Sequence, residues 1–134
     1  MEYLKQTFIY KQVGTLNLHA DVYLIESKDP RPVIFWLHGG GLIFGNREMI
    51  PEDQIQFYLS AGFSIVSIDY RLAPETKLSE IIKDVLDGYN WVLENGEELF
   101  NVDSSSVSVV GHSSGGYLAL CVGVFAHSKP RAIA

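Results

Sequence analysis

The chain has 134 residues, of which 47% are hydrophobic and 19% are charged, and its formal net charge is −6. This composition is typical of one folded domain and excludes intrinsic disorder. The acidic balance, without a cluster of Lys or Arg, opposes binding to nucleic acid. No stretch is long and apolar enough to span a bilayer, and the first residues lack the pattern of a secretion signal. We therefore expect a cytoplasmic protein without an integral membrane segment.

Metal ions, cofactors and disulfides are not expected either. Cys121 is the only cysteine, which excludes an intrachain disulfide, and no spacing of Cys and His is typical of a metal site. Cys121 falls within an apolar segment, so we interpret it as a small core residue and not as a nucleophile.

The first elements along the chain predict an antiparallel hairpin. Residues 3–13 are rich in β-branched and aromatic side chains, Gly14 provides a turn, and residues 16–25 alternate between hydrophobic and polar types. The pattern then changes to continuous apolar runs, which are typical of strands covered on both faces. Three such runs follow, over residues 33–37, 63–70 and 107–110.

Helical patterns separate these strands. Pro51 can open the first helix, because proline is favoured at the first helical position. The second helix carries apolar residues at helical spacing over residues 78–92, and we expect Asn95-Gly96 to close it. A third helical pattern begins after Ser113.

The alternation of strand and helix predicts the α/β class, with a hairpin followed by parallel strands. We expect one domain over residues 1–134. Residues 131–134 look like the start of a sixth strand, so that the chain would stop inside the sheet. The strand at 107–110 would then be left as an exposed parallel edge. Such edges pair with other chains, so we expect self-association.

A candidate nucleophile lies in Gly111-His112-Ser113-Ser114-Gly115, which matches the pattern G-x-S-x-G. The pentapeptide follows an apolar strand and precedes a helical pattern, where a sharp turn lifts a serine hydroxyl above the sheet. The two glycines leave room for the helix to press against the strand. Alone the pattern is weak, because a glycine-rich turn without a nucleophile can contain the same residues.

A second glycine motif, His38-Gly39-Gly40-Gly41, follows directly on the apolar run that ends at Leu37. Successive glycines let backbone N–H groups point into a cavity, and acyl transfer needs such donors to stabilise the oxyanion of its tetrahedral intermediate. A phosphate-binding loop is disfavoured, because neither glycine motif has the lysine of a P-loop or the G-x-G-x-x-G spacing. Together, the two motifs indicate a serine hydrolase.

These two motifs and a third block, DYRLAPE at residues 69–75, occur in the order and at the spacing of a known family. Over essentially its whole length, the chain resembles the esterase and lipase branch of the α/β-hydrolases that includes the hormone-sensitive-lipase-like enzymes. The resemblance implies an α/β-hydrolase fold. This chain would be its N-terminal part, with about five of the eight strands.

The resemblance also implies roles for individual residues. Ser113 would attack the acyl carbon and form an acyl-enzyme, and the backbone N–H groups of Gly40, Gly41 and Ser114 would hold the oxyanion. The residues expected to support the glycine loop, without touching substrate, are His38, Asp69 and Tyr70. This machinery implies a small-molecule ester substrate and needs neither a cofactor nor a metal.

A serine nucleophile needs a histidine base and an acid that orients it, and in this fold both follow the serine in the chain. His127 is the only histidine after Ser113, and 14 residues of helix would separate the two by about 21 Å. His112, His38 and His19 are poor candidates, because they lie beside the nucleophile, in the glycine loop and on the first hairpin. We expect the triad acid and histidine to be absent, and the isolated chain to be weakly active or inactive.

Three functions fit these motifs. The leading interpretation is a carboxylesterase or lipase-type serine hydrolase. An amidase, formamidase or acyl-peptidase would use the same groups, since amide hydrolysis also passes through an oxyanion. The third is a non-catalytic remnant that binds a small molecule or a partner chain. The missing base favours this third interpretation for the isolated chain. The intact glycine motifs oppose it for the longer enzyme of which this chain would be the N-terminal part.

Overall fold

The computed structural model describes residues 2–134 as a five-stranded β-sheet with three α-helices packed on its faces. The strands are β1 (Leu4–Val13), β2 (Leu16–Leu24), β3 (Arg31–Leu37), β4 (Ser64–Ile68) and β5 (Val102–Gly111). The helices are α1 (Glu52–Ser60), α2 (Leu78–Phe100) and α3 (Ser114–Phe125), with a 3-10 turn η1 (Arg47–Met49).

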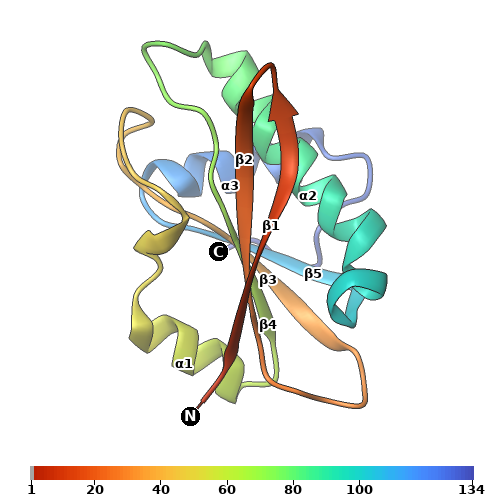
Figure 1. Ribbon diagram of the computed structural model, residues 1–134. Helices are drawn as coiled ribbons and strands as arrows, with labels where there is room; N and C mark the ends of the chain where they lie inside the picture. The colour runs from red at the N-terminus through yellow and green to blue at the C-terminus, as the bar shows by residue number, and fades with distance from the viewer. Residues whose placement is uncertain (1) are drawn as a thin grey trace.

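The strand order across the sheet is β1-β2-β4-β3-β5. β1 pairs antiparallel with β2, and β2 pairs antiparallel with β4, whereas β3 runs parallel to both β4 and β5. Figure 1 shows that the sheet twists strongly between the N-terminal hairpin and β5. The predicted α/β class, with a hairpin followed by parallel strands, is confirmed.

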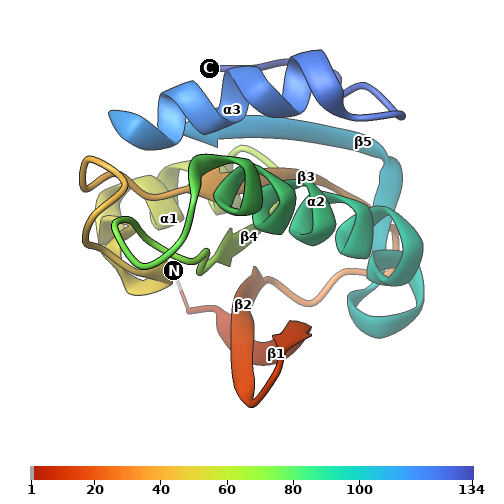
Figure 2. The ribbon, with the colours of Figure 1, turned by 90° about the horizontal axis from the view of Figure 1, so that it is seen from above.

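Helices cover both faces of the parallel part of the sheet, as Figure 2 shows from above. Phe35 and Leu37 of β3 face the larger core under α2 and α3, and Ile34 and Trp36 face the smaller core under α1. All four side chains are almost completely buried. This double coverage explains why β3 is a continuous apolar run and does not alternate with polar residues.

The predicted end of the second helix at Asn95-Gly96 is wrong, because α2 continues to Phe100 and ends at Asn101 in a left-handed conformation with φ 51°. Gly96 is buried inside the helix. A Cβ atom there would lie 2.8 Å from Cγ2 of Val102, so this glycine permits a close approach between α2 and β5. It is a packing residue and not a helix cap.

Residues 131–134 lie beside β5 in a parallel arrangement, which agrees with the expected start of a sixth strand. Their backbone exchanges hydrogen bonds of 2.8 to 2.9 Å with Val107, Val109 and Gly111. The expectation that the strand at 107–110 is an exposed edge is therefore wrong. Within residues 2–134, β5 is paired on both sides, with β3 and with residues 131–134.

A buried carboxylate joins three segments of the chain. Asp84 of α2 is fully buried and accepts two hydrogen bonds of 2.8 Å from the Arg71 guanidinium and one of 2.6 Å from Lys11 of β1. Burial alone raises the pKa of Asp84, but the hydrogen bonds from Arg71 and Lys11 outweigh it and the pKa is lowered. The network fixes both the hairpin and the segment after β4 to α2.

We expect Asp84→Asn to lower the free energy of unfolding at pH 7 by about 2–4 kcal/mol, because Arg71 and Lys11 lose their buried carboxylate and keep only the more exposed Glu80 and Asp87 as partners. The folded pKa lies below the unfolded one. The stabilisation is therefore complete above the pKa of an unfolded aspartate and is lost as pH falls through the folded pKa. Denaturant unfolding measured from pH 7 down to pH 3 should show a smaller acid loss in the variant. Identical acid dependence of the two proteins would contradict this assignment.

Candidate active site

Three loops converge at the carboxyl ends of the parallel strands. In the sheet register, Leu37 at the end of β3 lies beside Ile68 at the end of β4 and beside Gly111 at the end of β5. The HGGG loop, the DYRLAPE segment and the G-x-S-x-G turn therefore leave the sheet at the same edge. Open α/β sheets bind their ligands at this edge, which makes it the candidate active site.

Ser113 lies on a sharp turn between β5 and α3. Its backbone has φ 55° and ψ −118°, a conformation that side-chain-bearing residues rarely adopt and that costs about 1–3 kcal/mol. Two hydrogen bonds close the turn, from the Gly115 N–H to the His112 carbonyl at 2.9 Å and from the Gly116 N–H to the Ser113 carbonyl at 2.8 Å. The side chain of Ser113 is exposed. The turn thus presents a hydroxyl at the carboxyl edge of the sheet.

Two glycines allow this turn to press against the sheet. A Cβ atom at Gly115 would lie 2.3 Å from the Leu37 carbonyl oxygen and 2.5 Å from that of His38. A Cβ atom at Gly111 would lie 2.0 Å from the carbonyl oxygen of Gly115. Neither position can hold a larger residue without movement of the backbone. The spacing of the motif therefore reflects contacts with β3 as well as within the turn.

The glycine loop lies directly against the serine. A Cβ atom at Gly39 would be 3.1 Å from Cβ of Ser113. Gly40 and Gly41 have φ values of 125° and 63°, and a Cβ atom at Gly40 would lie 1.9 Å from the Phe44 carbonyl oxygen. Among residues 2–134, no group accepts a hydrogen bond from the N–H of Gly40, Gly41 or Ser114. These three N–H groups are thus unpaired, in a loop and a turn that touch at Gly39 and Ser113.

His38 and Tyr70 support the start of the glycine loop. Their rings stack with centroids 4.1 Å apart and planes 1° apart, and the Tyr70 hydroxyl donates to the His38 carbonyl at 2.6 Å. Nδ1 of His38 lies 2.7 Å from the carbonyl oxygen of Gly39, where its N–H can donate. Burial lowers the pKa of His38 and raises the pKa of Tyr70 to about 12, so both rings are neutral at pH 7.

Asp69 anchors the segment that follows the glycine loop by pairing with Arg47, a residue that no sequence motif identifies. Its carboxylate accepts a hydrogen bond from the Arg47 backbone N–H at 2.8 Å and pairs with the Arg47 guanidinium at 2.5 Å. Arg47 also pairs with the fully buried Asp21 of β2 at 3.0 Å. A lone arginine after a glycine-rich loop carries no recognisable pattern, so only the fold identifies this link.

None of the four histidines is hydrogen-bonded to the Ser113 hydroxyl in the described residues. Among residues 2–134, no side chain forms a hydrogen bond with the Ser113 hydroxyl. His38 is buried in its stack, and His19 lies on β2. His112 and His127 are exposed, the second beyond the far end of α3.

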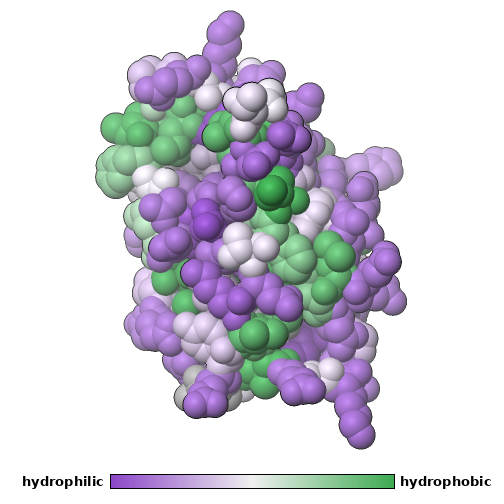
Figure 3. All heavy atoms as spheres, in the orientation of Figure 1, coloured by the Kyte–Doolittle hydropathy of each residue, from purple (hydrophilic) through white to green (hydrophobic). Residues whose placement is uncertain are grey.

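Apolar side chains form one rim of the site. Ile43 and Phe44, in the loop after the HGGG motif, are 60% and 62% exposed. Figure 3 shows hydrophobic side chains gathered on the side of the molecule where Figure 1 places this loop. An apolar group bound near Ser113 would find favourable contacts here.

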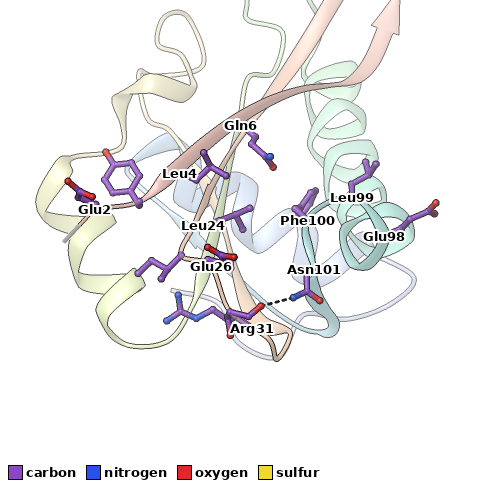
Figure 4. A pocket seen from close by; sticks show the side chains of 14 residues that line it. Glu2, Leu4, Gln6, Leu24, Glu26, Arg31, Glu98, Leu99, Phe100 and Asn101 are labelled. Carbon is purple, nitrogen blue, oxygen red and sulfur yellow. Dashed lines mark hydrogen bonds between the residues drawn. The ribbon is translucent and has the colours of Figure 1, made fainter.

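A separate hollow of about 700 Å³ opens at the amino ends of the parallel strands, opposite to the candidate active site, between the hairpin and the end of α2 (Figure 4). Its walls include Leu24, Arg31, Phe100 and Asn101, which lie where β2 and α2 end and where β3 begins. It contains none of the predicted site residues. In the described part of the chain, no group of three or more His, Cys, Asp or Glu is placed to hold a metal ion, and no helix could cross a membrane.

A comparison with protein families matches residues 34–134 to a family model for the α/β-hydrolase fold. Among curated proteins, the chain is 40% identical to the non-reducing polyketide synthase Preu6 of Preussia isomera and 37% identical to the methylphloroacetophenone synthase of Cladonia uncialis. Each match covers 90% of this chain, but only 6% and 5% of the respective synthase.

Solved esterases share the fold. The apo form of Thermogutta terrifontis esterase 2 superposes with a TM-score of 0.84 at 24% identity, over 96% of this chain and 53% of the esterase. A bacterial heroin esterase superposes with a TM-score of 0.78 at 28% identity, over 87% of this chain and 37% of the esterase. The chain therefore spans about half of the first esterase and a smaller part of the second.

The contact between the turn and β3 can be tested at two neighbouring glycines. We expect Gly115→Ala to lower the free energy of unfolding by more than about 2 kcal/mol, because its methyl group would overlap two backbone carbonyls. Gly116→Ala is the matched control, since its Cβ would lie 3.5 Å from the nearest atom, an ordinary contact. Its unfolding free energy should change by less than about 1 kcal/mol. Equal effects of the two variants in urea unfolding would refute the packing argument.

The support of the glycine loop by Tyr70 can be tested by Tyr70→Phe. The variant keeps the stack but leaves the buried His38 carbonyl without its donor, so we expect a loss of about 1–3 kcal/mol. Amide hydrogen exchange in the segment 38–41 should become faster. Tyr3→Phe, which removes an exposed hydrogen bond to Glu52, is the control and should leave that exchange unchanged.

Proposed function

The chain belongs to the α/β-hydrolase fold family, and from this premise we propose that it carries the nucleophile and the oxyanion donors of a serine hydrolase acting on carboxylic esters. The observation that carries the proposal is the contact of the HGGG loop with Ser113 at Gly39, in a loop and turn where the N–H groups of Gly40, Gly41 and Ser114 have no acceptor among the described residues. A nucleophile on a strained turn beside free backbone donors is the arrangement that acyl transfer requires.

In the proposed reaction, the Ser113 oxygen attacks the acyl carbon while a base takes the hydroxyl proton. The carbonyl oxygen becomes an oxyanion, and the N–H groups of Gly40, Gly41 and Ser114 stabilise it. Each such donor contributes about 2.7–4 kcal/mol to lowering the barrier. The alcohol then leaves with the proton, and water hydrolyses the acyl-enzyme by the same steps.

His38 is excluded as the base by its surroundings. Its ring is buried against Tyr70, and Nδ1 is engaged with the Gly39 carbonyl. Burial also lowers its pKa, so it remains neutral as a structural residue. We propose the same supporting role for Asp69 and Tyr70, which contact the glycine loop and its continuation and not the serine.

The apolar rim at Ile43 and Phe44 favours an ester with an apolar acyl or alcohol group. The similarity to polyketide synthases supports a second candidate substrate, the acyl group of a polyketide held as an ester or a thioester. Both substrates would pass through the same oxyanion. Matched oxygen esters, thioesters and amides of one aromatic acyl group would separate these substrates from an amidase activity.

The proposal predicts that a fluorophosphonate probe labels Ser113. The probe's phosphorus would bond to Oγ with loss of fluoride, and mass spectrometry of tryptic peptides would locate the adduct. Ser113→Ala should abolish labelling, whereas Ser114→Ala should retain it, because Ser114 contributes through its backbone N–H. An adduct at a residue other than Ser113, or equal labelling of Ser113→Ala and the wild-type chain, would refute the proposed nucleophile.

A further inference from the structure

The hollow between the hairpin and the end of α2 has apolar walls. Leu24 and Phe100 line it on the inside, where both pack against the larger core. Leu4 and Leu99 line it on the outside and are 56% and 46% exposed. Its volume of about 700 Å³ is within the range of small-molecule sites, and such sites have mainly apolar walls. The hollow is therefore a candidate binding site.

Hydrogen bonds fix the segments that form these walls. The Asn101 side chain donates to the Ser27 carbonyl at 3.1 Å, which joins the connection after α2 to the connection after β2 (Figure 4). Just before β1, the Tyr3 hydroxyl donates to Glu52 of α1 at 2.8 Å. Contacts within the fold thus hold the walls in place.

The hollow lies away from the part of the sheet that borders residues 131–134. Its described walls contain no residue of α3 or of that segment. In the strand order, β4 and β3 separate β2, which borders the hollow, from β5, which pairs with residues 131–134. Ser113 and the glycine loop lie at the opposite ends of the parallel strands. A ligand in the hollow would therefore occupy a site distinct from the candidate active site.

Acidic side chains surround the opening of the hollow. Glu2, Glu26 and Glu98 are wall residues and are exposed, and none of them forms an ion pair within residues 2–134. Figure 4 shows Glu2 on the side of α1 and Glu98 on the side of α2. Three carboxylates at one opening attract a cation and repel an anion.

The carboxyl end of α2 adds to this negative potential. Residues 98–100 of the helix belong to the wall, and its last turn contains no basic residue. The carbonyl groups at the end of a helix carry a partial negative charge, which stabilises a nearby cation. Charge at the opening and the helix end thus favour the same sign of ligand.

Arg31 is the one cation among the described wall residues, and its guanidinium is engaged within the fold. Nη2 donates to the Leu59 carbonyl at 2.9 Å, and Nη1 is buried without a partner. A buried nitrogen and a nitrogen bound to α1 are poorly placed to hold an anion in the hollow. Arg31 therefore does not offset the preference for a cation.

We propose that the hollow binds a small amphipathic amine. Its apolar part packs against Leu24 and Phe100, and its ammonium group lies at the acidic opening beside Glu26 and Glu98. Burial of the apolar part drives binding, and the carboxylates and the helix end select the positive charge. An apolar carboxylic acid would meet the same carboxylates and be repelled. This site shares no residue with the proposed hydrolase site, so either proposal stands or fails without the other.

Binding is tested by titrating the chain with 4-phenylbutylamine, 4-phenylbutanol and 4-phenylbutyrate, which carry a similar apolar part and a positive, no and a negative charge. Amide shifts in NMR spectra locate each probe. We expect the amine to move the signals of Leu24 and Asn101 and to bind about 3–10-fold more tightly than the alcohol, with the carboxylate weakest. Added salt should reduce the preference for the amine, because it screens exposed charges.

Three results of this titration would overturn the proposal. One is equal affinity of the three probes, which would remove the role of charge. Another is a set of shifts confined to residues 38–41 and 111–115, which would place the amine in the candidate active site. The third is the absence of any shift at the highest soluble concentration of the amine.

Variants test whether the walls of the hollow bind the probe. Leu4→Lys removes an apolar contact and brings a like charge to the opening, so we expect the amine to bind about tenfold more weakly. Leu16→Lys is the matched control, because Leu16 is a leucine of the same hairpin, 49% exposed and outside the hollow, and it should bind like the wild type. Equal binding by the two variants would overturn the proposed site.

A second pair of variants tests the charge at the opening. Glu26→Gln should weaken binding of the amine about 2–5-fold and leave binding of the alcohol unchanged. Glu94→Gln, at an exposed acid of α2 outside the hollow, is the control and should change neither. Equal loss of amine binding in both variants would show a general effect of net charge and overturn the role of Glu26.

Discussion

The close contact between the turn at Gly115 and the carbonyl groups at the end of β3 governs the whole candidate site. It brings two segments, more than seventy residues apart in the sequence, to within van der Waals distance of each other. Without a side chain at position 115, α3 can begin directly against Leu37 and His38. The serine is then held beside the glycine loop by backbone atoms alone. Such a site depends on sheet register more than on side-chain rotamers, because parallel pairing sets where β3 and β5 end.

Much of this arrangement is predictable from the sequence. Continuous apolar runs identify strands buried on both faces, and helical spacing identifies the segments between them. The two glycine motifs follow strands, so their meeting at one edge of the sheet follows from parallel pairing. The choice of Cys121 as a core residue is also confirmed, since it is buried in α3.

The features that were not predictable depend on contacts between distant segments. Gly96 is a helix-ending signal in the local sequence, yet the helix continues, with the side chain of Val102 packed 2.8 Å from where a Cβ of Gly96 would lie. The partnership of Arg47 with Asp21 and Asp69 has no local pattern at all. Likewise, whether β5 has a free edge depends on how residues 131–134 return to it, which no periodicity reveals. The local sequence pattern predicts individual helices and strands. Ion pairs and strand pairing between residues far apart in the sequence can be seen only in the folded chain.

The hairpin has a further consequence for biosynthesis. Lys11 contacts Asp84, 73 residues later, and the Tyr10 hydroxyl donates to the backbone carbonyl of Asp69, 59 residues later. On the ribosome, β1 and β2 therefore emerge long before the helix and the strand against which they dock. At ordinary elongation rates of about 5–20 residues per second, the hairpin waits for several seconds with its apolar face uncovered. An early-synthesised element with late partners is where a chaperone is most needed, and the exposed Leu4, Ile9 and Leu16 of this hairpin add to its apolar surface.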